Sequence, residues 1–231
     1  MDDRKHILLI CYIADPFDPI GTNRIGGGHI YLLDLARFLV QQGYMVSFIT
    51  RKNHVDKPSK EQLGSYFTIY RIECGEKVDI PPNMVAHCFD SLREKTFNLI
   101  DQLLPVHLIH SHYWISGTIA MQYCTQNKIR HVHTVLSIGK VKQFLGEPVS
   151  DIDDFRNSCE EMVYHSADAL LLICPNEKSN FIHFFPNVDK NKLYIIPNGI
   201  NTRIFYPREV TPDNYFFRAT ERFKEGLTSI S

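Results

Sequence analysis

The chain has 231 residues, of which 44% are hydrophobic and 22% are charged, and its formal net charge is -1 at pH 7. These values are typical of a globular protein, and the near-zero charge removes the usual electrostatic basis for binding nucleic acid or an acidic membrane. The first apolar run, residues 6–13, is too short to span a bilayer and lacks a small-residue cleavage site. We therefore interpret it as a strand and expect a cytoplasmic protein.

Apolar runs recur along the chain and predict strands at residues 6–13, 45–50, 66–72, 106–112, 130–135, 168–173 and 193–197. Several runs are continuously apolar, which is typical of strands that are covered on both faces. Helical periodicity predicts helices at residues 29–44, 83–104, 115–127 and 153–166. This alternation indicates an α/β fold with a doubly wound, mainly parallel sheet in a single Rossmann-like domain. We assign residues 1–207 to the domain and residues 208–231 to a tail.

The six cysteines occur singly, without a C-x-x-C pair that would indicate zinc or a redox centre. Most of them lie within apolar runs. They are interpreted as buried, reduced thiols, as expected in the cytosol.

A glycine-rich loop follows the first predicted strand, with Gly21 and then Gly26, Gly27 and Gly28 at the start of a helix. Glycines here would let backbone amides approach a phosphate or sugar oxygen closely. A tight turn is the structural alternative. The G-x-G-x-x-G fingerprint and the P-loop Lys-Ser/Thr are both absent, so neither nucleotide motif is met, and a Rossmann oxidoreductase is disfavoured.

Two further groups raise the question of a metal. His110 and His112 end one predicted strand, and His131 and His133 lie on the next, so that each pair shares a face. No recognisable ligand spacing completes such a site, and hydrogen bonding is the alternative. The acidic segment 151–154 resembles a metal-binding Asp-x-Asp pair, but acidic residues before a helical period are typical of a capped helix start. We therefore predict no metal.

Several stretches are more specific together than any one is alone. They are GGGHIYLLDLARFLVQQGYMVSFITR, VHLIHSHYWISG, LSIGKVK, FRNSCEEMVYHSADALLLI and LYIIPNGINTRIFYP. Their order and spacing resemble the N-terminal half of family 4 glycosyltransferases, in the branch that contains sucrose-phosphate synthases and the enzyme that begins mycothiol synthesis. The resemblance covers residues 5–207, and the combination of HYWxSG with PNGxxxxxFxP is highly specific.

The resemblance implies a GT-B architecture, in which an N-terminal acceptor domain and a C-terminal donor domain face each other across a cleft. It also implies a retaining transfer that usually needs no metal and no cofactor. We expect this chain to be the acceptor half, inactive alone, with a donor-binding domain as its partner in cis or as a separate chain. The expected ligands are a small sugar acceptor and a nucleotide-sugar, which is a donor substrate held mainly by the other domain.

The resemblance also implies acceptor-binding residues. Gly26 and Gly27 match the glycine pair beside the reacting sugars, and Tyr113 matches a tyrosine that lines the acceptor site. Ser137 and Lys142 belong to a segment that contacts a phosphorylated acceptor. Arg156 resembles an arginine with a similar role, since a planar guanidinium can bind phosphate through two hydrogen bonds.

Two positions depart from the family pattern. Leu136 stands where the family has its catalytic-site histidine, which contacts the donor sugar, commonly at the 6-hydroxyl. We therefore predict no catalytic residue in this chain, and a donor without a 6-hydroxyl becomes a hypothesis. Pro82 and Asn83 replace a family lysine, for which Lys77 could substitute only if the loop folds differently. The alternative function is a non-catalytic sugar-binding or regulatory module with a degenerate active site.

Overall fold

The computed structural model describes residues 3–18, 27–103, 105–199, 202 and 206–207. The chain divides into two units, Met1–Asn198 and Gly199–Ser231, and the helices and strands given below belong to the first. The predictions for the tail, residues 208–231, lie outside the described residues.

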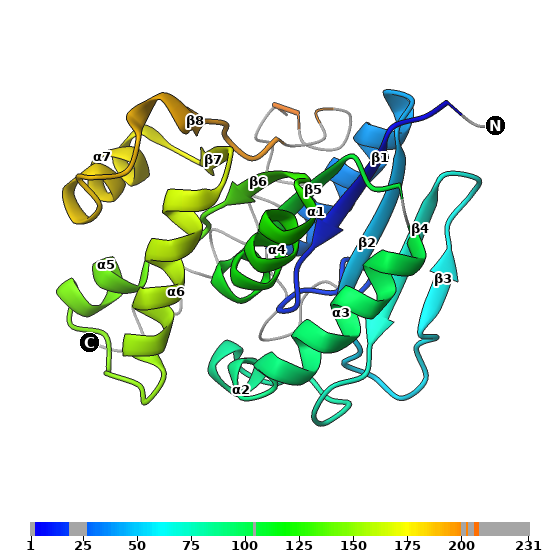
Figure 1. The fold of residues 1–231 in the computed structure, drawn as a ribbon, viewed down its shortest axis with the longest axis horizontal. Coiled ribbons are helices and arrows are strands. Elements are labelled where there is room, and N and C mark those ends of the chain that lie inside the picture. Colours follow the sequence, from blue (N-terminus) through cyan, green and yellow to red (C-terminus); the bar gives the residue numbers. More distant parts are fainter. Residues whose placement is uncertain (1–2, 19–26, 104, 200–201, 203–205, 208–231) are drawn as a thin grey trace, which may run out of the picture. The chain divides into compact units, whose positions relative to one another are not determined.

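In the described part of the chain, strands β1 to β8 form one sheet in the order β3-β4-β2-β1-β5-β6-β7-β8 (Figure 1). Neighbouring strands are parallel, except that β3 is antiparallel to β4. The bounds are β1 His6–Ile10, β2 Met45–Arg51, β3 Lys60–Gln62, β4 Phe67–Ile72, β5 Leu108–His112, β6 Arg130–Thr134, β7 Ala169–Leu172 and β8 Leu193–Ile195. The predicted α/β class and mainly parallel sheet are confirmed.

Helices cover both faces of this sheet (Figure 1). Their bounds are α1 Gly27–Gln41, α2 Pro82–Ala86, α3 Phe89–Leu103, α4 Trp114–Asn127, α5 Gly139–Phe144, α6 Asp153–Ser166 and α7 Pro175–Phe184, with a 3-10 turn at Lys190–Lys192. Helix α1 packs on one face, and α3 and α4 pack on the other. The sheet is therefore doubly wound, as predicted.

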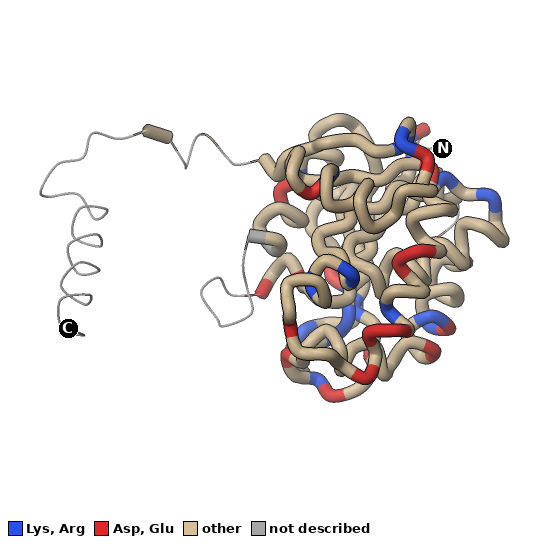
Figure 2. Tube along the Cα trace, turned by 90° about the vertical axis from the view of Figure 1, so that its left-hand side faces the viewer, with Lys and Arg blue, Asp and Glu red and all other residues tan. Residues whose placement is uncertain are grey.

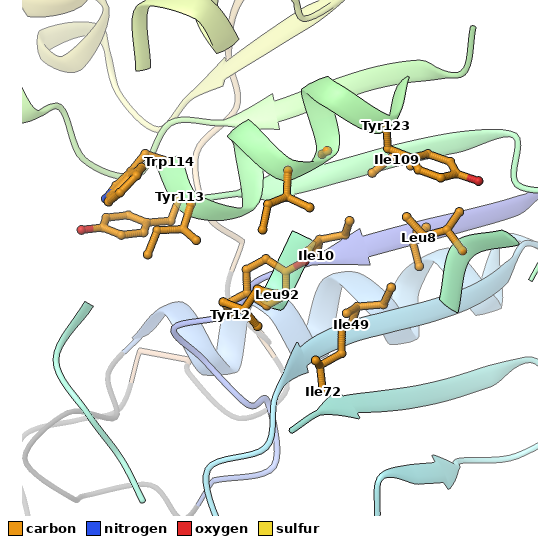
Figure 3. Close-up of a cluster of buried hydrophobic side chains, with 14 of the residues drawn as sticks. Leu8, Ile10, Tyr12, Ile49, Ile72, Leu92, Ile109, Tyr113, Trp114 and Tyr123 are labelled. Atoms are coloured by element: carbon orange, nitrogen blue, oxygen red, sulfur yellow. The ribbon is translucent and has the colours of Figure 1, made fainter. Parts of the chain in front are cut away.

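The central strand β1 contributes to the core on both faces. Leu8 and Ile10 pack under α3 and α4, whereas Leu9 packs under α1. Each of these side chains is fully buried, which explains why the strand is continuously apolar in sequence. Figure 3 shows Tyr113 and Trp114 at one end of the first of these clusters, where α4 begins. The core thus extends up to the edge of the sheet where the strands end.

Several elements differ from the sequence prediction, among them the helices α5 and α7, which were not predicted. The predicted helix at residues 83–104 is split into α2, which has its C-cap at His87, and α3, which begins at Phe89, although both helices contribute buried residues to the same core cluster. Strand β3 was not predicted, since its residues Lys60–Gln62 are polar. It pairs antiparallel with β4 at the edge of the sheet, where a strand does not need an apolar face.

The cysteines are free thiols, and Cys11, Cys74, Cys124 and Cys159 are buried, in agreement with the sequence interpretation. Burial raises the pKa of Cys11 to about 12, so that this thiol is unreactive at neutral pH.

Basic and acidic positions are interspersed along the trace in the view of Figure 2. Within the described ranges, no helix combines the length and the apolar character that crossing a membrane would require.

Candidate functional site

A pocket of about 200 Å³ opens beyond the carboxyl ends of β5 and β6, where parallel α/β sheets place their ligands. Its walls come from α2, from Tyr113 and Trp114 after β5, from α5, and from the start of α6 with the loop before it. Three of the residues predicted from sequence, Tyr113, Lys142 and Arg156, line it together. The structure therefore brings into one place residues that are far apart in the sequence.

Tyr113 joins β5 to α4 in a strained conformation. Its φ is 69° and its ψ is 154°, a region of backbone space that is essentially reserved for glycine. The conformation is held from both sides, because the Tyr113 amide donates to the Thr134 carbonyl over 3.3 Å and the Gly117 amide donates to the Tyr113 carbonyl over 2.9 Å. Strain of this kind clusters at binding and active sites, where it aims a side chain.

Leu136 makes a second sharp turn directly after β6. Its φ is 57°, and the Ser137 amide donates to the Val135 carbonyl over 2.7 Å across it. This is the hydrogen bond of a γ-turn, and with a positive φ at the central residue such turns are rare and strained. The turn brings Ser137 to Arg156 of α6, whose Nη2 lies 3.1 Å from the serine Oγ. Both strand-to-helix loops at the pocket thus contain a strained non-glycine residue.

Arg156 supplies the buried positive charge of the site, and only 6% of its surface is exposed. Its Nε donates to Oε1 of Glu160 over 2.6 Å, and its Cζ lies 5.3 Å from the centre of the Tyr113 ring. Burial by itself lowers the pKa of Arg156, but the Glu160 carboxylate raises it above its ordinary value. Among the described residues, Nη1 donates no hydrogen bond, so one arm of the guanidinium is available to a ligand in the pocket.

Glu160 also binds a second group besides Arg156. It is fully buried, and its second oxygen, Oε2, accepts from the Gly139 amide over 2.9 Å. A Cβ at Gly139 would lie 2.5 Å from Oδ1 of Asn157 and 3.0 Å from Nε of Arg156, so this close approach of α5 to α6 requires glycine. The carboxylate therefore connects the arginine to the start of the helix that carries Lys142.

Lys142 lies at the pocket with a different partner. Its Nζ donates to Oε2 of Glu147 over 2.9 Å, and both side chains are about half exposed. Beside it, Gln143 accepts from Nδ2 of Asn157 over 3.0 Å, which fixes α5 against α6. The pocket thus holds two cations, one rigid and buried and one exposed and already paired.

Not every predicted residue can be placed at this pocket. Gly26 lies outside the described residues, and Gly27 is the first residue of α1, so the role of both glycines stays a prediction. Lys77 pairs with Glu73 at 3.2 Å and is not among the residues that line this pocket, whereas Pro82 and Asn83 line it.

The four sheet histidines are buried, and the rings of His110, His131 and His133 are hydrogen-bonded, whereas neither ring nitrogen of His112 has a hydrogen-bond partner among the described residues. The Ser111 Oγ lies 2.7 Å from Nε2 of His131 and 2.8 Å from Nδ1 of His133. Burial lowers the pKa of His112 to about 3 and that of His131 to about 4, and it lowers the pKa of His110 and His133 as well. No three His, Cys, Asp or Glu side chains of the described residues are grouped as metal ligands.

The acidic segment before α6 is engaged locally. The Asp153 carboxylate accepts from the Ser150 amide over 2.9 Å, and Asp151 accepts from the Ser150 hydroxyl over 3.1 Å. Asp153 and Asp154 lie in the first turn of α6, but the N-cap residue, Ile152, makes no side-chain capping hydrogen bond, so the expected capped helix start is not found.

Comparison with known protein families shows to which family this chain belongs. The model of the family described as Glycosyltransferase Family 4 matches residues 25–204. The chain belongs to glycosyltransferase family 4. The family recognised in the motifs is thereby confirmed.

Curated relatives of this family 4 chain have names that contain phosphorylated compounds. D-inositol 3-phosphate glycosyltransferase of Stackebrandtia nassauensis is 25% identical over 209 residues, which are 88% of this chain and 46% of that protein. Mannosylfructose-phosphate synthase of Agrobacterium fabrum is 28% identical over 200 residues, which are 82% of this chain and 44% of that protein. The chain thus spans about half the length of the curated relatives it matches.

Among solved structures, sucrose-phosphate synthase from Thermosynechococcus elongatus superposes with a TM-score of 0.77 at 27% identity. The match covers 89% of this chain and 51% of that one. Starch synthase IV of Arabidopsis thaliana, at 11% identity and a TM-score of 0.58, shows likeness of fold alone. The α/β domain of this family 4 chain therefore has the Rossmann-like fold that the GT-B resemblance implies.

Sequence reasoning missed several residues of this family 4 site. Glu160, Gln143 and Glu147 were not singled out, although Glu160 lies four residues after Arg156 on a predicted helix. That spacing is the available signal, since residues four apart share a helix face. Burial, which distinguishes this pair from an ordinary surface pair, is not visible in the sequence.

Proposed function

We propose that this chain is the acceptor-binding part of a retaining glycosyltransferase that transfers a sugar from a nucleotide-sugar to a small, phosphorylated acceptor. The observation that carries the proposal is the guanidinium of Arg156 at the pocket beyond β5 and β6. Its Nε and Nη2 groups are fixed by Glu160 and Ser137, Nη1 donates no hydrogen bond to another described residue, and Arg156 lines the pocket. Such a preorganised guanidinium suits a phosphate oxygen.

The remaining pocket lining supports a phosphorylated sugar or polyol. Asn83, Gln143 and Asp153 offer donors and acceptors for hydroxyl groups, while Tyr113 and Trp114 offer ring surface. The names of the relatives, D-inositol 3-phosphate glycosyltransferase and mannosylfructose-phosphate synthase, also favour a phosphorylated substrate.

The donor site belongs, in this proposal, to a second Rossmann-like domain, in cis or as a separate chain. This is supported by the chain covering 51% of the sucrose-phosphate synthase chain on which it superposes. The retaining outcome and the need for that second domain are carried over from the family resemblance. We further propose that the donor is a substrate held mainly by that domain, and that no cofactor takes part.

One observation favours a second candidate, a non-catalytic sugar-binding or regulatory module. Leu136, which stands where the resemblance places the family histidine, lies in a strained turn after β6. If transfer occurs nonetheless, the missing imidazole favours a donor without a 6-hydroxyl. Transfer assays with the donor-binding domain supplied separate these cases. A preference for ordinary hexose donors would reject the donor hypothesis, and no transfer from any nucleotide-sugar would favour the module.

The proposed function is tested by calorimetry on the chain with D-inositol 3-phosphate, inositol and UDP-glucose. Binding of the phosphate ester, with at least tenfold weaker binding of inositol, is expected because a charge-assisted hydrogen bond to phosphate contributes about 1.5–3 kcal/mol. The substitution Arg156→Lys should weaken the binding of the phosphate ester and leave the binding of inositol unchanged. Tight binding of UDP-glucose with no binding of the phosphate ester would overturn the assignment of this pocket to the acceptor.

A further inference from the structure

The carboxylate of Glu160 lies behind the pocket and not in it. It is fully buried on α6, and its two oxygens have separate partners on two elements. Oε1 accepts from Nε of Arg156 over 2.6 Å, and Oε2 accepts from the amide of Gly139 over 2.9 Å. One side chain therefore fixes both the guanidinium on α6 and the first residue of α5.

Both partners carry pocket groups. Arg156 lines the pocket directly, and α5 contributes Gly139, Lys142 and Gln143 to its wall. The other hydrogen bond of the guanidinium, from Nη2 to the Ser137 hydroxyl, is longer at 3.1 Å. Without the carboxylate, the arginine would lose its shortest hydrogen bond, and α5 would lose the acceptor for its first amide.

We propose that Glu160 is a positioning residue. It sets the orientation of the Arg156 guanidinium and the position of the first residue of α5, and thereby determines the affinity of the pocket for phosphate monoesters. This inference rests on the proposed function for the nature of the ligand. It does not make Glu160 a catalytic residue, since the carboxylate is not among the pocket-lining groups.

Simple electrostatics predicts the opposite effect of removing this charge. A carboxylate beside an anion site repels the anion, so its loss should strengthen phosphate binding. Positioning predicts that the loss weakens binding, because a guanidinium without its Nε partner no longer presents its free arm in one direction. The sign of the change therefore separates the two explanations.

The test compares Glu160→Gln with the matched control Glu161→Gln. Glu161 is the next residue of α6, is half exposed, and pairs at 3.3 Å with Lys140 of α5. The substitution Glu160→Gln keeps the volume and an oxygen for the Gly139 amide, but the new amide group cannot replace both acceptor oxygens. Glu160→Asp keeps the charge and shortens the reach, so simple electrostatics predicts wild-type affinity for it.

Calorimetry with D-inositol 3-phosphate provides the first readout, with thermal unfolding to confirm that each variant is folded. We expect Glu160→Gln to bind at least roughly tenfold more weakly, Glu160→Asp to fall in between, and Glu161→Gln to match the wild type. Tighter binding by Glu160→Gln, or wild-type affinity in Glu160→Asp, would overturn the positioning role.

The second readout does not depend on the ligand. In the wild type, the Nε–H proton of Arg156 should give an NMR signal that is shifted downfield and protected from exchange, assigned by its loss in Arg156→Lys. Glu160→Gln should lose this protection, and Glu161→Gln should retain it. If the wild type binds no phosphate ester, the proposed function fails, while this signal still decides the role of Glu160. An unprotected signal in the wild type contradicts the inference.

Discussion

Lys142 and Glu147 form an ion pair at the candidate acceptor pocket, with Nζ and Oε2 2.9 Å apart. Both side chains line the pocket, and both are about half exposed. An anionic ligand would therefore compete with Glu147 for the same ammonium group. The exposed cation of this site is held by an internal carboxylate, whereas the buried cation, Arg156, keeps a free arm.

The first prediction concerns this competition. Glu147→Gln should bind D-inositol 3-phosphate roughly two- to fivefold more tightly, because an exposed ion pair is worth about 0.2–1 kcal/mol. Thermal stability should hardly change. The gain should shrink at high salt, since exposed charges are screened. Weaker binding by this variant would show that Glu147 contacts the ligand itself.

The second prediction concerns the strained backbone of Tyr113. Replacing a residue by glycine usually costs more stability than replacing it by alanine. At φ 69° and ψ 154° the order should reverse, with Tyr113→Gly about 1 kcal/mol more stable than Tyr113→Ala. At Gln122 in the middle of α4, the ordinary order should hold, and Gln122→Gly should be about 1 kcal/mol less stable than Gln122→Ala. Urea denaturation of the four variants measures both differences.

The third prediction compares two helix glycines. A Cβ at Gly117 in α4 would lie 2.6 Å from Cε1 of His133, whereas a Cβ at Gly28 in α1 has nothing within 4 Å. Gly117→Ala should therefore destabilise the protein by about 1–3 kcal/mol through overpacking. Gly28→Ala should stabilise it by about 0.5–1 kcal/mol through helix propensity. A neutral effect of Gly117→Ala on stability would contradict the close packing of α4 against His133 of β6.

The fourth prediction concerns the buried histidines. The pKa of His112 is lowered to about 3 and that of His131 to about 4 by burial, while an unfolded histidine has a pKa of about 6.5. Between these values the unfolded chain binds more protons than the folded one, so stability is lost as the pH falls below about 6.5. Each of the two histidines should lower the free energy of unfolding by about 1.4 kcal/mol at pH 5.5 relative to pH 8.

Urea denaturation between pH 8 and pH 5.5 measures this linkage. His131→Asn should lower the dependence of the unfolding free energy on pH by close to one proton. A stability that is constant over this range would contradict the burial of neutral imidazoles in the sheet.

Long, regular segments were predictable from local pattern. The helix at residues 153–166 has the predicted bounds, and α4 begins one residue before the predicted start. The splitting of residues 83–104 and the short helix α5 were not predictable. Helix α5 has only six residues, and its first amide is held by Glu160 of α6, a contact across 21 residues of sequence. Periodicity over one or two turns does not report such a contact.

Local periodicity and motifs of fixed spacing were sufficient to predict the longer helices, all strands except β3, the mainly parallel sheet and the family. The sequence also singled out Tyr113, Ser137, Lys142 and Arg156. Only the tertiary structure decided that these residues converge, that Arg156 is buried against Glu160, and that Lys142 is already paired. The physical reason is that parallel strands bring distant loops to one edge of the sheet. There, burial and long-range hydrogen bonds set the charge and direction of each side chain.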